Sequence, residues 1–355
     1  MTTSLPAHTD ELTADWVTEV LQARHPGARV AEVSVLDERG STNHHVRLGL
    51  AYDTAAGAPD TLFCKMASLD PAHRAAIGAT GMGAREARFY SEMASQLSMR
   101  VPTCYFAGSD PDGRFMLVLE DLRASGCRTS DGTWGISPDL AASGLADLAE
   151  LHVAYEDPAR LGAVEAWISA NPPGNVEFTA PLLRQVIDEH RSILSDEYVA
   201  VGELYVADPR AVMAQWAQGP KTVVHGDAHL GNVFVDGDRI GFLDWGLMAV
   251  APPMRDVSYF ISLQLTPEDR RPVEADLVRH YLEVRSTLGG SPISFDDAWQ
   301  QHRVHSGYLV LASFLSLVPP YNGEDQRDFS DRFRNRAMAS LGDLGGAEAL
   351  RTALG

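Results

Sequence analysis

Residues 223–246 have the sequence VVHGDAHLGNVFVDGDRIGFLDWG. Short apolar runs rich in Val, Ile and Phe alternate here with polar residues, a pattern that predicts a strand, a loop, a second strand, a turn and a third strand. Asp236-Gly237-Asp238 has the composition of the tight turn between the last two strands. We therefore expect the polar loop residues to lie at a rim of these strands.

Three polar residues of this stretch have the spacing of a phosphoryl-transfer site. Asp227 and Asn232 form a D-x-x-x-x-N pattern, and Asp244 opens a D-x-G at the end of the next strand. Phosphoryl transfer needs a carboxylate that accepts a hydroxyl proton and oxygen ligands that hold Mg²⁺ against the phosphates. The stretch offers one base and two metal ligands.

With these motifs the chain resembles the superfamily of aminoglycoside phosphotransferases, choline kinases and ecdysteroid-kinase-like proteins, which share the protein-kinase fold. Each motif alone occurs by chance in many proteins, but their order and spacing between strands of suitable length are specific. The residues that carry the resemblance are His225-Gly226-Asp227 with Asn232, Leu243-Asp244-Trp245-Gly246 and Arg255-Asp256-Val257-Ser258.

The resemblance implies an α+β, protein-kinase-like fold in two lobes. Residues 1–120 would form a nucleotide-binding lobe with a small antiparallel sheet, one main helix and an N-terminal cap helix at 10–24. Residues 121–355 would form a larger, mostly helical lobe with the catalytic loop and the substrate site. In the first lobe, period-two alternation and apolar runs predict strands at residues 29–37, 44–52, 61–66, 102–108 and 114–119.

The resemblance also implies roles for residues of the central stretch. Asp227 would be the catalytic base, and Asn232 and Asp244 would hold Mg²⁺. His225 would support the loop, and Asp256 would anchor it through buried hydrogen bonds.

A lysine and a glutamate in the first lobe are expected to pair. The strand at 61–66 carries a single charge, Lys65, and the helix near 83–96 carries Glu86 on its apolar stripe. A carboxylate on a buried face needs a partner. By resemblance, Lys65 would bind the α- and β-phosphates of ATP while Glu86 orients it.

Two further segments are expected at the nucleotide by resemblance. The turn with Gly40, Ser41 and Thr42 would cover the phosphates, although its single glycine fits a plain hairpin turn equally well. The backbone from Glu120 to Leu122 would form the hinge that contacts the adenine edge.

The second lobe shows helical periods. Ser137 and Pro138 begin a helix in which His152 lies on the apolar side, so His152 is expected to be a packed structural residue. Residues 156–177 are predicted to form an irregular connection. Further helices are predicted near 178–200, 208–217, 254–264, 267–287, 294–316 and 325–342.

The composition excludes several classes of protein. The chain has 355 residues, 45% hydrophobic and 22% charged, which suits two domains or one large two-lobed unit. The net charge of −19 argues against a nucleic-acid partner and permits a cationic substrate, although solubility alone accounts for it. The three cysteines lack the spacing of a disulfide framework or zinc ribbon. Without an apolar run of ~20 residues or a signal peptide, we expect a cytoplasmic protein with no membrane partner.

Position 226 bears on the acceptor. Protein kinases carry an arginine there that reads a phosphorylated activation loop, whereas this chain has Gly226. Only twelve residues lead from Asp244 to Asp256, which is too few for a long activation segment. We therefore expect a small-molecule acceptor.

Two other functions would use the same residues. His225, Asp227 and His229 alternate along the chain and could bind zinc or iron in a metal-dependent hydrolase. That function gives no role to Asn232 or Asp244, nor to the lysine and glutamate of the first lobe. The chain could also be a kinase-like binding protein without catalysis, against which the presence of Asp227, Asn232 and Asp244 argues.

The sequence favours an ATP- and Mg²⁺-dependent phosphotransferase that acts on a hydroxyl of a small molecule. The acceptor stays open among antibiotics, amino alcohols, sugars and lipophilic alcohols. The oligomeric state and the preference for ATP over GTP stay open as well.

Overall fold

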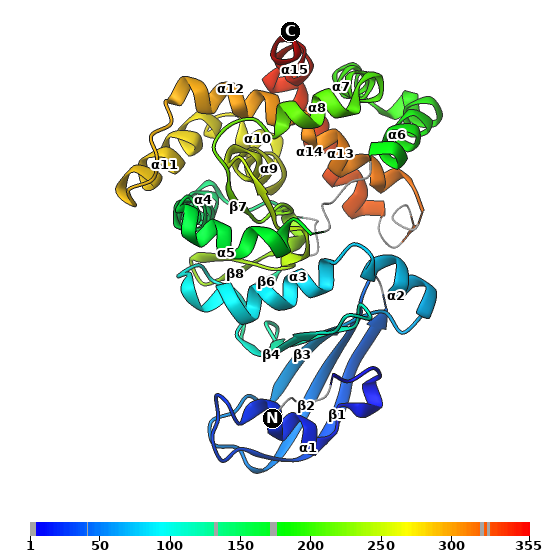
Figure 1. The fold of residues 1–355 in the computed structure, drawn as a ribbon, viewed down its shortest axis with the longest axis vertical. Coiled ribbons are helices and arrows are strands. Elements are labelled where there is room, and N and C mark those ends of the chain that lie inside the picture. The colour runs from blue at the N-terminus through cyan, green and yellow to red at the C-terminus, as the bar shows by residue number, and fades with distance from the viewer. Residues whose placement is uncertain (1–4, 41, 131–133, 171–175, 320–322, 325–326) are drawn as a thin grey trace. The chain divides into compact units, whose positions relative to one another are not determined.

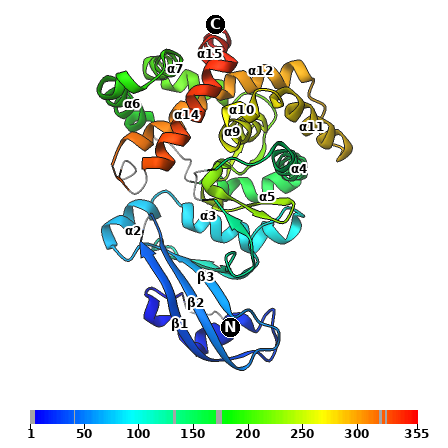
Figure 2. The same cartoon turned by 180° about the vertical axis from the view of Figure 1, so that it is seen from behind.

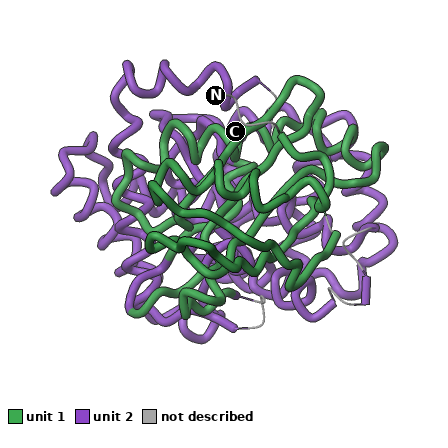
Figure 3. Tube along the Cα trace, turned by 90° about the horizontal axis from the view of Figure 1, so that it is seen from below, with its two compact units in different colours: residues 1–129, 234–237, 241–247 green, residues 130–233, 238–240, 248–355 purple. Residues whose placement is uncertain are grey.

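The computed structural model describes residues 5–40, 42–130, 134–170, 176–319, 323–324 and 327–355. The chain divides into two compact units, drawn in separate colours in Figure 3. Unit 1 consists of residues 1–129, 234–237 and 241–247, and unit 2 of residues 130–233, 238–240 and 248–355. The chain thus passes between the units within the stretch that carries the motifs.

Unit 1 contains an antiparallel sheet of five strands in the order β1-β2-β3-β5-β4. Figure 1 labels four of these strands, β1 to β4. All five predicted strands are present. Alternation along β3 buries Leu62, Cys64 and Met66 in one apolar cluster, so Lys65 lies on the other face, paired in register with His45. The strands are β1 (Arg29–Gly40), β2 (His44–Thr54), β3 (Thr61–Met66), β4 (Cys104–Ser109) and β5 (Phe115–Glu120).

The N-terminal helix is shorter than predicted. The sequence predicts a helix at 10–24, but Thr9–Glu11 form only a 3₁₀ turn, η1, and the α-helix is α1 (Ala14–Leu21). The side chain of Thr13 accepts the N–H of Trp16 at 3.3 Å, which fixes the start of α1.

The helix predicted near 83–96 changes its winding along its length. After α2 (Pro71–Gly78), α3 (Met82–Arg88) is followed by a π-helical turn, η2 (Phe89–Met93), and a 3₁₀ turn, η3 (Ala94–Gln96). Single π-helical turns are rare and often lie at functional sites. Here the turn begins three residues after Glu86.

The predicted order of strand, loop, strand, turn and strand is confirmed. β6 (Arg128–Thr129), β8 (Val233–Asp236) and β9 (Arg239–Phe242) form one sheet, and β7 (Thr222–Val224) pairs with β10 (Ala249–Ala251). The 3₁₀ turns η5 (Leu230–Asn232) and η6 (Trp245–Leu247) lie after β7 and β9. In the turn between β8 and β9, Gly237 has φ +62°, a conformation that favours glycine.

Unit 2 is mostly helical (Figure 2). α4 begins as predicted, because Ser137 accepts the N–H of Leu140 and proline occupies the first position. No helix within the described ranges is long and apolar enough to cross a bilayer. The helices are α4 (Pro138–Ala154), α5 (Pro158–Ile168), α6 (Val176–His190), α7 (Asp196–Ala207), α8 (Pro209–Trp216), α9 (Met254–Gln264), α10 (Pro267–Arg270), α11 (Glu274–Thr287), α12 (Phe295–Ser306), α13 (Tyr308–Ser313), α14 (Arg327–Leu344) and α15 (Gly346–Leu354), with 3₁₀ turns η4 (Arg191–Ile193) and η7 (Phe314–Leu317).

Several helix predictions in unit 2 were wrong. Residues 156–177 contain α5, which forms because the Asp157 side chain accepts the N–H groups of Ala159 and Arg160. α15 was not predicted. Within one predicted helix, Ser195 caps a new helix with its side chain and so interrupts the first. The predicted helices that are divided into shorter ones lie near 178–200, 267–287 and 294–316.

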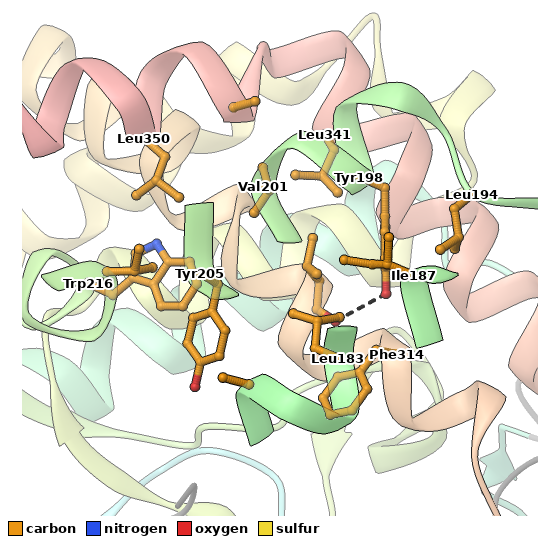
Figure 4. Close-up of a cluster of buried hydrophobic side chains, with 14 of the residues drawn as sticks. Leu183, Ile187, Leu194, Tyr198, Val201, Tyr205, Trp216, Phe314, Leu341 and Leu350 are labelled. Atoms are coloured by element: carbon orange, nitrogen blue, oxygen red, sulfur yellow. Dashed lines mark hydrogen bonds between the residues drawn. The ribbon is translucent and has the colours of Figure 1, made fainter. Parts of the chain in front are cut away.

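A buried apolar cluster joins α6, α7 and α8 to the C-terminal helices (Figure 4). Tyr198 is fully buried in it, and its hydroxyl donates to the carbonyl of Val310 at 3.2 Å. The labelled members are Leu183, Ile187, Leu194, Tyr198, Val201, Tyr205, Trp216, Phe314, Leu341 and Leu350.

Candidate active site

In unit 2, the loop after β7 is fixed by a carboxylate of α9. Asp256 is fully buried, and its oxygens accept the backbone N–H of His225 at 2.6 Å and that of Gly226 at 2.9 Å. Gly226 has φ +82°, which side chains of L-residues rarely adopt, so the backbone conformation itself favours glycine here. These contacts fit the anchoring expected of Asp256.

His152 of α4 completes this anchor. Its Nε2 lies 3.3 Å from Oδ2 of Asp256, and its Nδ1 lies 2.8 Å from the hydroxyl of Tyr281. Burial raises the pKa of Asp256, but the hydrogen bond and charge of His152 and the backbone donors outweigh burial and hold the pKa below its ordinary value. His152 is fully buried and packed, as predicted.

The carboxylate of Asp227 is held at both oxygens. Oδ2 accepts from Nδ2 of Asn232 at 2.9 Å, and Oδ1 accepts from the hydroxyl of Tyr259 at 2.8 Å. The Asp227 side chain is 21% exposed, so a ligand can reach it. A fixed, partly exposed carboxylate is suited to accept a proton.

The amide of Asn232 has one orientation relative to Asp227. Its Nδ2 donates both to the carboxylate and to the backbone carbonyl of Asp227, each at 2.9 Å. The two donor hydrogens are thus engaged, and the amide oxygen is directed away from these contacts. An amide oxygen is a suitable ligand for Mg²⁺.

The residues of the hydrolase alternative do not assemble as metal ligands. Nδ1 of His225 accepts the N–H of Asp227 at 3.2 Å, and Nδ1 of His229 accepts the N–H of Gly231 at 2.9 Å. One ring nitrogen of each histidine therefore serves the loop backbone. Over the part of the chain that the structure describes, no group of three His, Cys, Asp or Glu side chains could hold a metal ion.

In unit 1, Lys65 of β3 lies between two carboxylates. Its Nζ is 2.7 Å from Oε2 of Glu86 and 3.1 Å from Oδ2 of Asp244. Lys65 and Glu86 are buried, whereas the Asp244 side chain is 41% exposed. The expected contact between Lys65 and Glu86 is confirmed, and Asp244 joins it as a third member.

Burial and charge act in opposite directions in this cluster. Burial lowers the pKa of Lys65, but the charges of Asp244 and Glu86 outweigh it and raise the pKa above its ordinary value. For Glu86, burial prevails over the charge of Lys65 and raises the pKa to about 7. Lys65 therefore stays positively charged and faces one exposed carboxylate, that of Asp244.

The segment with Asp244 is held in a constrained conformation. Asp244 has φ +57°, which costs free energy for residues other than glycine, although aspartate tolerates it better than most. Two contacts support the segment. Trp245 stacks face to face on Phe89, with centroids 3.8 Å apart, and the guanidinium of Arg85 donates to the carbonyl of Gly246.

The turn expected over the nucleotide phosphates joins β1 and β2. Gly40 pairs with His44 at the end of the two strands, and Thr42 follows in the turn. Ser41 lies outside the described residues. A role of Gly40, Ser41 and Thr42 at the phosphates stays a prediction.

The expected hinge is tied to neighbouring segments. The carboxylate of Glu120 pairs with Arg100 at 2.8 Å and accepts the N–H of Thr103 at 3.0 Å. The carbonyl of Leu122 accepts the N–H of Cys127 at 3.0 Å. Only backbone groups outside these bonds could contact an adenine, and that contact stays a prediction.

Sequence reasoning missed Tyr259, which contacts Asp227, and Arg85, which binds the backbone two residues after Asp244. Tyr259 lies three residues after Asp256 and therefore on the same side of α9, a spacing that could have identified it. Arg85 directly precedes Glu86, but a charged residue on a helix gives no sign that it binds the backbone of a distant segment.

A model of the phosphotransferase enzyme family matches residues 61–291. This range covers more than half of the chain and includes both the lysine of β3 and the loop after β7. None of the curated proteins matches the chain in sequence.

Solved structures share the fold at low sequence identity. A protein from Ralstonia eutropha, provisionally named an aminoglycoside phosphotransferase, has a TM-score of 0.53 and 15% identity over 92% of this chain and 98% of its own. A GDP-bound aminoglycoside 2′-phosphotransferase has a TM-score of 0.50 and 14% identity over 94% and 99%. A choline kinase from Streptococcus pneumoniae has a TM-score of 0.50 and 13% identity over 93% and 98%. The predicted fold class is confirmed.

Proposed function

Because this chain belongs to the phosphotransferase enzyme family, we propose that it transfers the γ-phosphate of ATP to a hydroxyl group of a small molecule, with Mg²⁺ as cofactor. The observation that carries the proposal is the partly exposed carboxylate of Asp227, held by Asn232 and Tyr259 on an anchored loop. Such a carboxylate suits the base of a phosphoryl transfer.

In this proposal, unit 1 residues bind the nucleotide. Lys65 would pair with the α- and β-phosphates, because it stays charged and lies beside Asp244, the exposed carboxylate proposed to bind Mg²⁺. Glu86 would keep Lys65 in place. The turn at residues 40–42 would cover the phosphates, and the backbone at residues 120–122 would contact the adenine.

Asn232 and Asp244 would supply oxygen ligands to Mg²⁺. Each side chain offers an oxygen of the kind that a hard divalent cation binds: the amide oxygen of Asn232 is not needed at Asp227, and the carboxylate of Asp244 is partly exposed. When bound, the ion would neutralise charge on the phosphates.

Asp227 would take the proton of the acceptor. The acceptor O–H bond breaks, its oxygen forms a bond to the γ-phosphorus, and the bond from that phosphorus to ADP breaks. The proton ends on the carboxylate of Asp227, and the products are a phosphate monoester and ADP. Since the transition state of this reaction is loose, most of the gain in rate comes from orientation.

The proposed acceptor is small. Gly226 offers no side chain to read a phosphorylated loop, and twelve residues from Asp244 to Asp256 leave no room for a peptide-docking segment. We assign nucleotide binding to residues 1–120 and acceptor binding to residues 121–355. The proposed setting is the cytoplasm, with no nucleic acid or membrane as partner.

The test is a screen of the purified, unphosphorylated protein with Mg·ATP. The panel contains aminoglycosides, choline and ethanolamine, sugars and lipophilic alcohols, and ADP release and product mass are measured. Parallel samples contain protein substrates, GTP or a zinc chelator. Transfer to proteins but to no small alcohol, or a hydrolytic activity that only the zinc chelator removes, would contradict the proposal.

A further inference from the structure

We propose that Tyr259 is a positioning residue for phosphoryl transfer, whose hydroxyl fixes the carboxylate of Asp227 in the orientation that meets the acceptor hydroxyl. The inference rests on the function proposed above, in which Asp227 accepts the proton. Its basis is the hydrogen bond of 2.8 Å from the Tyr259 hydroxyl to Oδ1 of Asp227.

The protein core sets the position of this hydroxyl. Tyr259 is 5% exposed and belongs to an apolar cluster of α9, α13 and α14. Rotation of the ring away from Asp227 would require movement in a close-packed interior. The other buried members are Leu263, Leu309, Phe333 and Ala337.

The phenol is a permanent donor. Burial first, and then the charge of Asp227, raise the pKa of Tyr259 well above its ordinary value. Tyr259 therefore keeps its proton throughout the physiological range. Its hydroxyl donates a hydrogen bond to the carboxylate of Asp227.

Asp227 is held from two directions. Asn232, in η5, donates to Oδ2, and Tyr259, in α9, donates to Oδ1. Together they prevent rotation about the Cβ–Cγ bond of Asp227. Without the phenol only one oxygen would be held, and the lone pairs that remain for the acceptor would lose their fixed direction.

The Tyr259 hydrogen bond acts on the orientation of Asp227. A loose transition state asks little of the base until late in the reaction, so its direction toward the acceptor hydroxyl matters most. Tyr259 keeps its proton while the acceptor proton moves to Asp227. A hydrogen bond to a charged group that orients the base is expected to change kcat about tenfold.

The experiment compares Tyr259→Phe with Tyr198→Phe. Both substitutions remove a buried hydroxyl in unit 2, but that of Tyr198 donates to the carbonyl of Val310 in the core. Tyr259→Phe should lower kcat about tenfold without changing the KM for ATP, whereas Tyr198→Phe should leave kcat within about twofold. In an Asp227→Asn background, Tyr259→Phe should cause no further loss.

A third protein, with 3-fluorotyrosine at position 259, keeps the hydroxyl and should retain the wild-type kcat, which serves as the rescue if the phenylalanine variant folds poorly. An unchanged kcat in Tyr259→Phe, or an undiminished effect in the Asp227→Asn background, would overturn the inference.

If the wild type transfers phosphate neither to any acceptor nor to water, the proposed function fails. Crystal structures then decide on Tyr259 separately: Asp227 should have one rotamer in the wild type and several in Tyr259→Phe, and one shared rotamer would refute the inference.

Discussion

Glu86 of α3 accepts a hydrogen bond from the backbone N–H of Trp245, the residue that follows Asp244. The same carboxylate pairs with Nζ of Lys65 at 2.7 Å. One side chain therefore connects β3, α3 and the segment with Asp244. A change at Glu86 should disturb Lys65 and Asp244 together.

The pair of Lys65 and Glu86 should behave as one unit. Lys65→Met and Glu86→Gln are each expected to lower kcat/KM by roughly tenfold or more, and the double variant by little more than either alone, because each change already disrupts the contact. Steady-state kinetics of the four proteins would measure this coupling.

Arg88 and Glu92 provide the matched control. They lie four residues apart on the segment that follows Glu86 and form an ion pair, and both side chains are 42% exposed. Removing this exposed pair should change kcat/KM little and the free energy of unfolding by about 0.5 kcal/mol or less. Independent, multiplicative effects of the Lys65 and Glu86 variants would mean that the buried contact has no role in catalysis.

Asp227→Asn should lower kcat by roughly 10²-fold or more while ATP still binds, because the amide keeps the shape of the carboxylate but does not accept a proton. Kinetics and nucleotide titration measure the two effects separately. Asp238→Asn, in the exposed turn between β8 and β9, is the control and should be neutral. Near wild-type turnover of Asp227→Asn would remove the role of base.

Asp244 should be tested as Asp244→Asn as well as Asp244→Ala. Alanine tolerates φ +57° poorly, whereas asparagine adopts it readily, so only the asparagine variant separates the loss of charge from backbone strain. Both should abolish transfer, and Mg²⁺ or Mn²⁺ should support the wild type. Stoichiometric zinc in the purified protein that is lost in His229→Ala would instead favour the hydrolase.

Stability should depend on pH through His305 of α12. Burial first, and then the charges of Arg255 and His302, lower its pKa to about 3. The unfolded chain protonates near pH 6.5, so protons favour the unfolded state, and stability is lost as the pH falls from about 6.5 towards about 3. In urea denaturation between about pH 7 and pH 4, the free energy of unfolding of His305→Gln should vary less with pH than that of the wild type.

The exposed His8 supplies the comparison. His8→Gln removes a histidine that the fold leaves exposed. The variant should keep the wild-type slope of the free energy of unfolding against pH. The same slope in His305→Gln and the wild type would show that His305 does not contribute.

Local sequence pattern was sufficient to predict a contact where the charged residue interrupts an otherwise apolar strand or helix face. Alternation in β3 placed Lys65 on the other face of the sheet from Cys64 and Met66. An apolar helix stripe with one carboxylate identified Glu86 as the partner of Lys65. Local pattern was insufficient where a helix changes its winding. The π-helical turn that begins at Phe89 is an example.

By itself, the sequence determined which residues can perform the chemistry and in which order they follow one another, because strand period, turn composition and motif spacing are properties of neighbouring residues. Tertiary structure alone decided how those residues are held. Asp256 binds the backbone of Gly226, and Tyr259 binds Asp227, across about thirty residues of chain. Such contacts arise only when helices and loops pack together: helical spacing places Tyr259 on the same side of α9 as Asp256, but it does not show which loop that side meets.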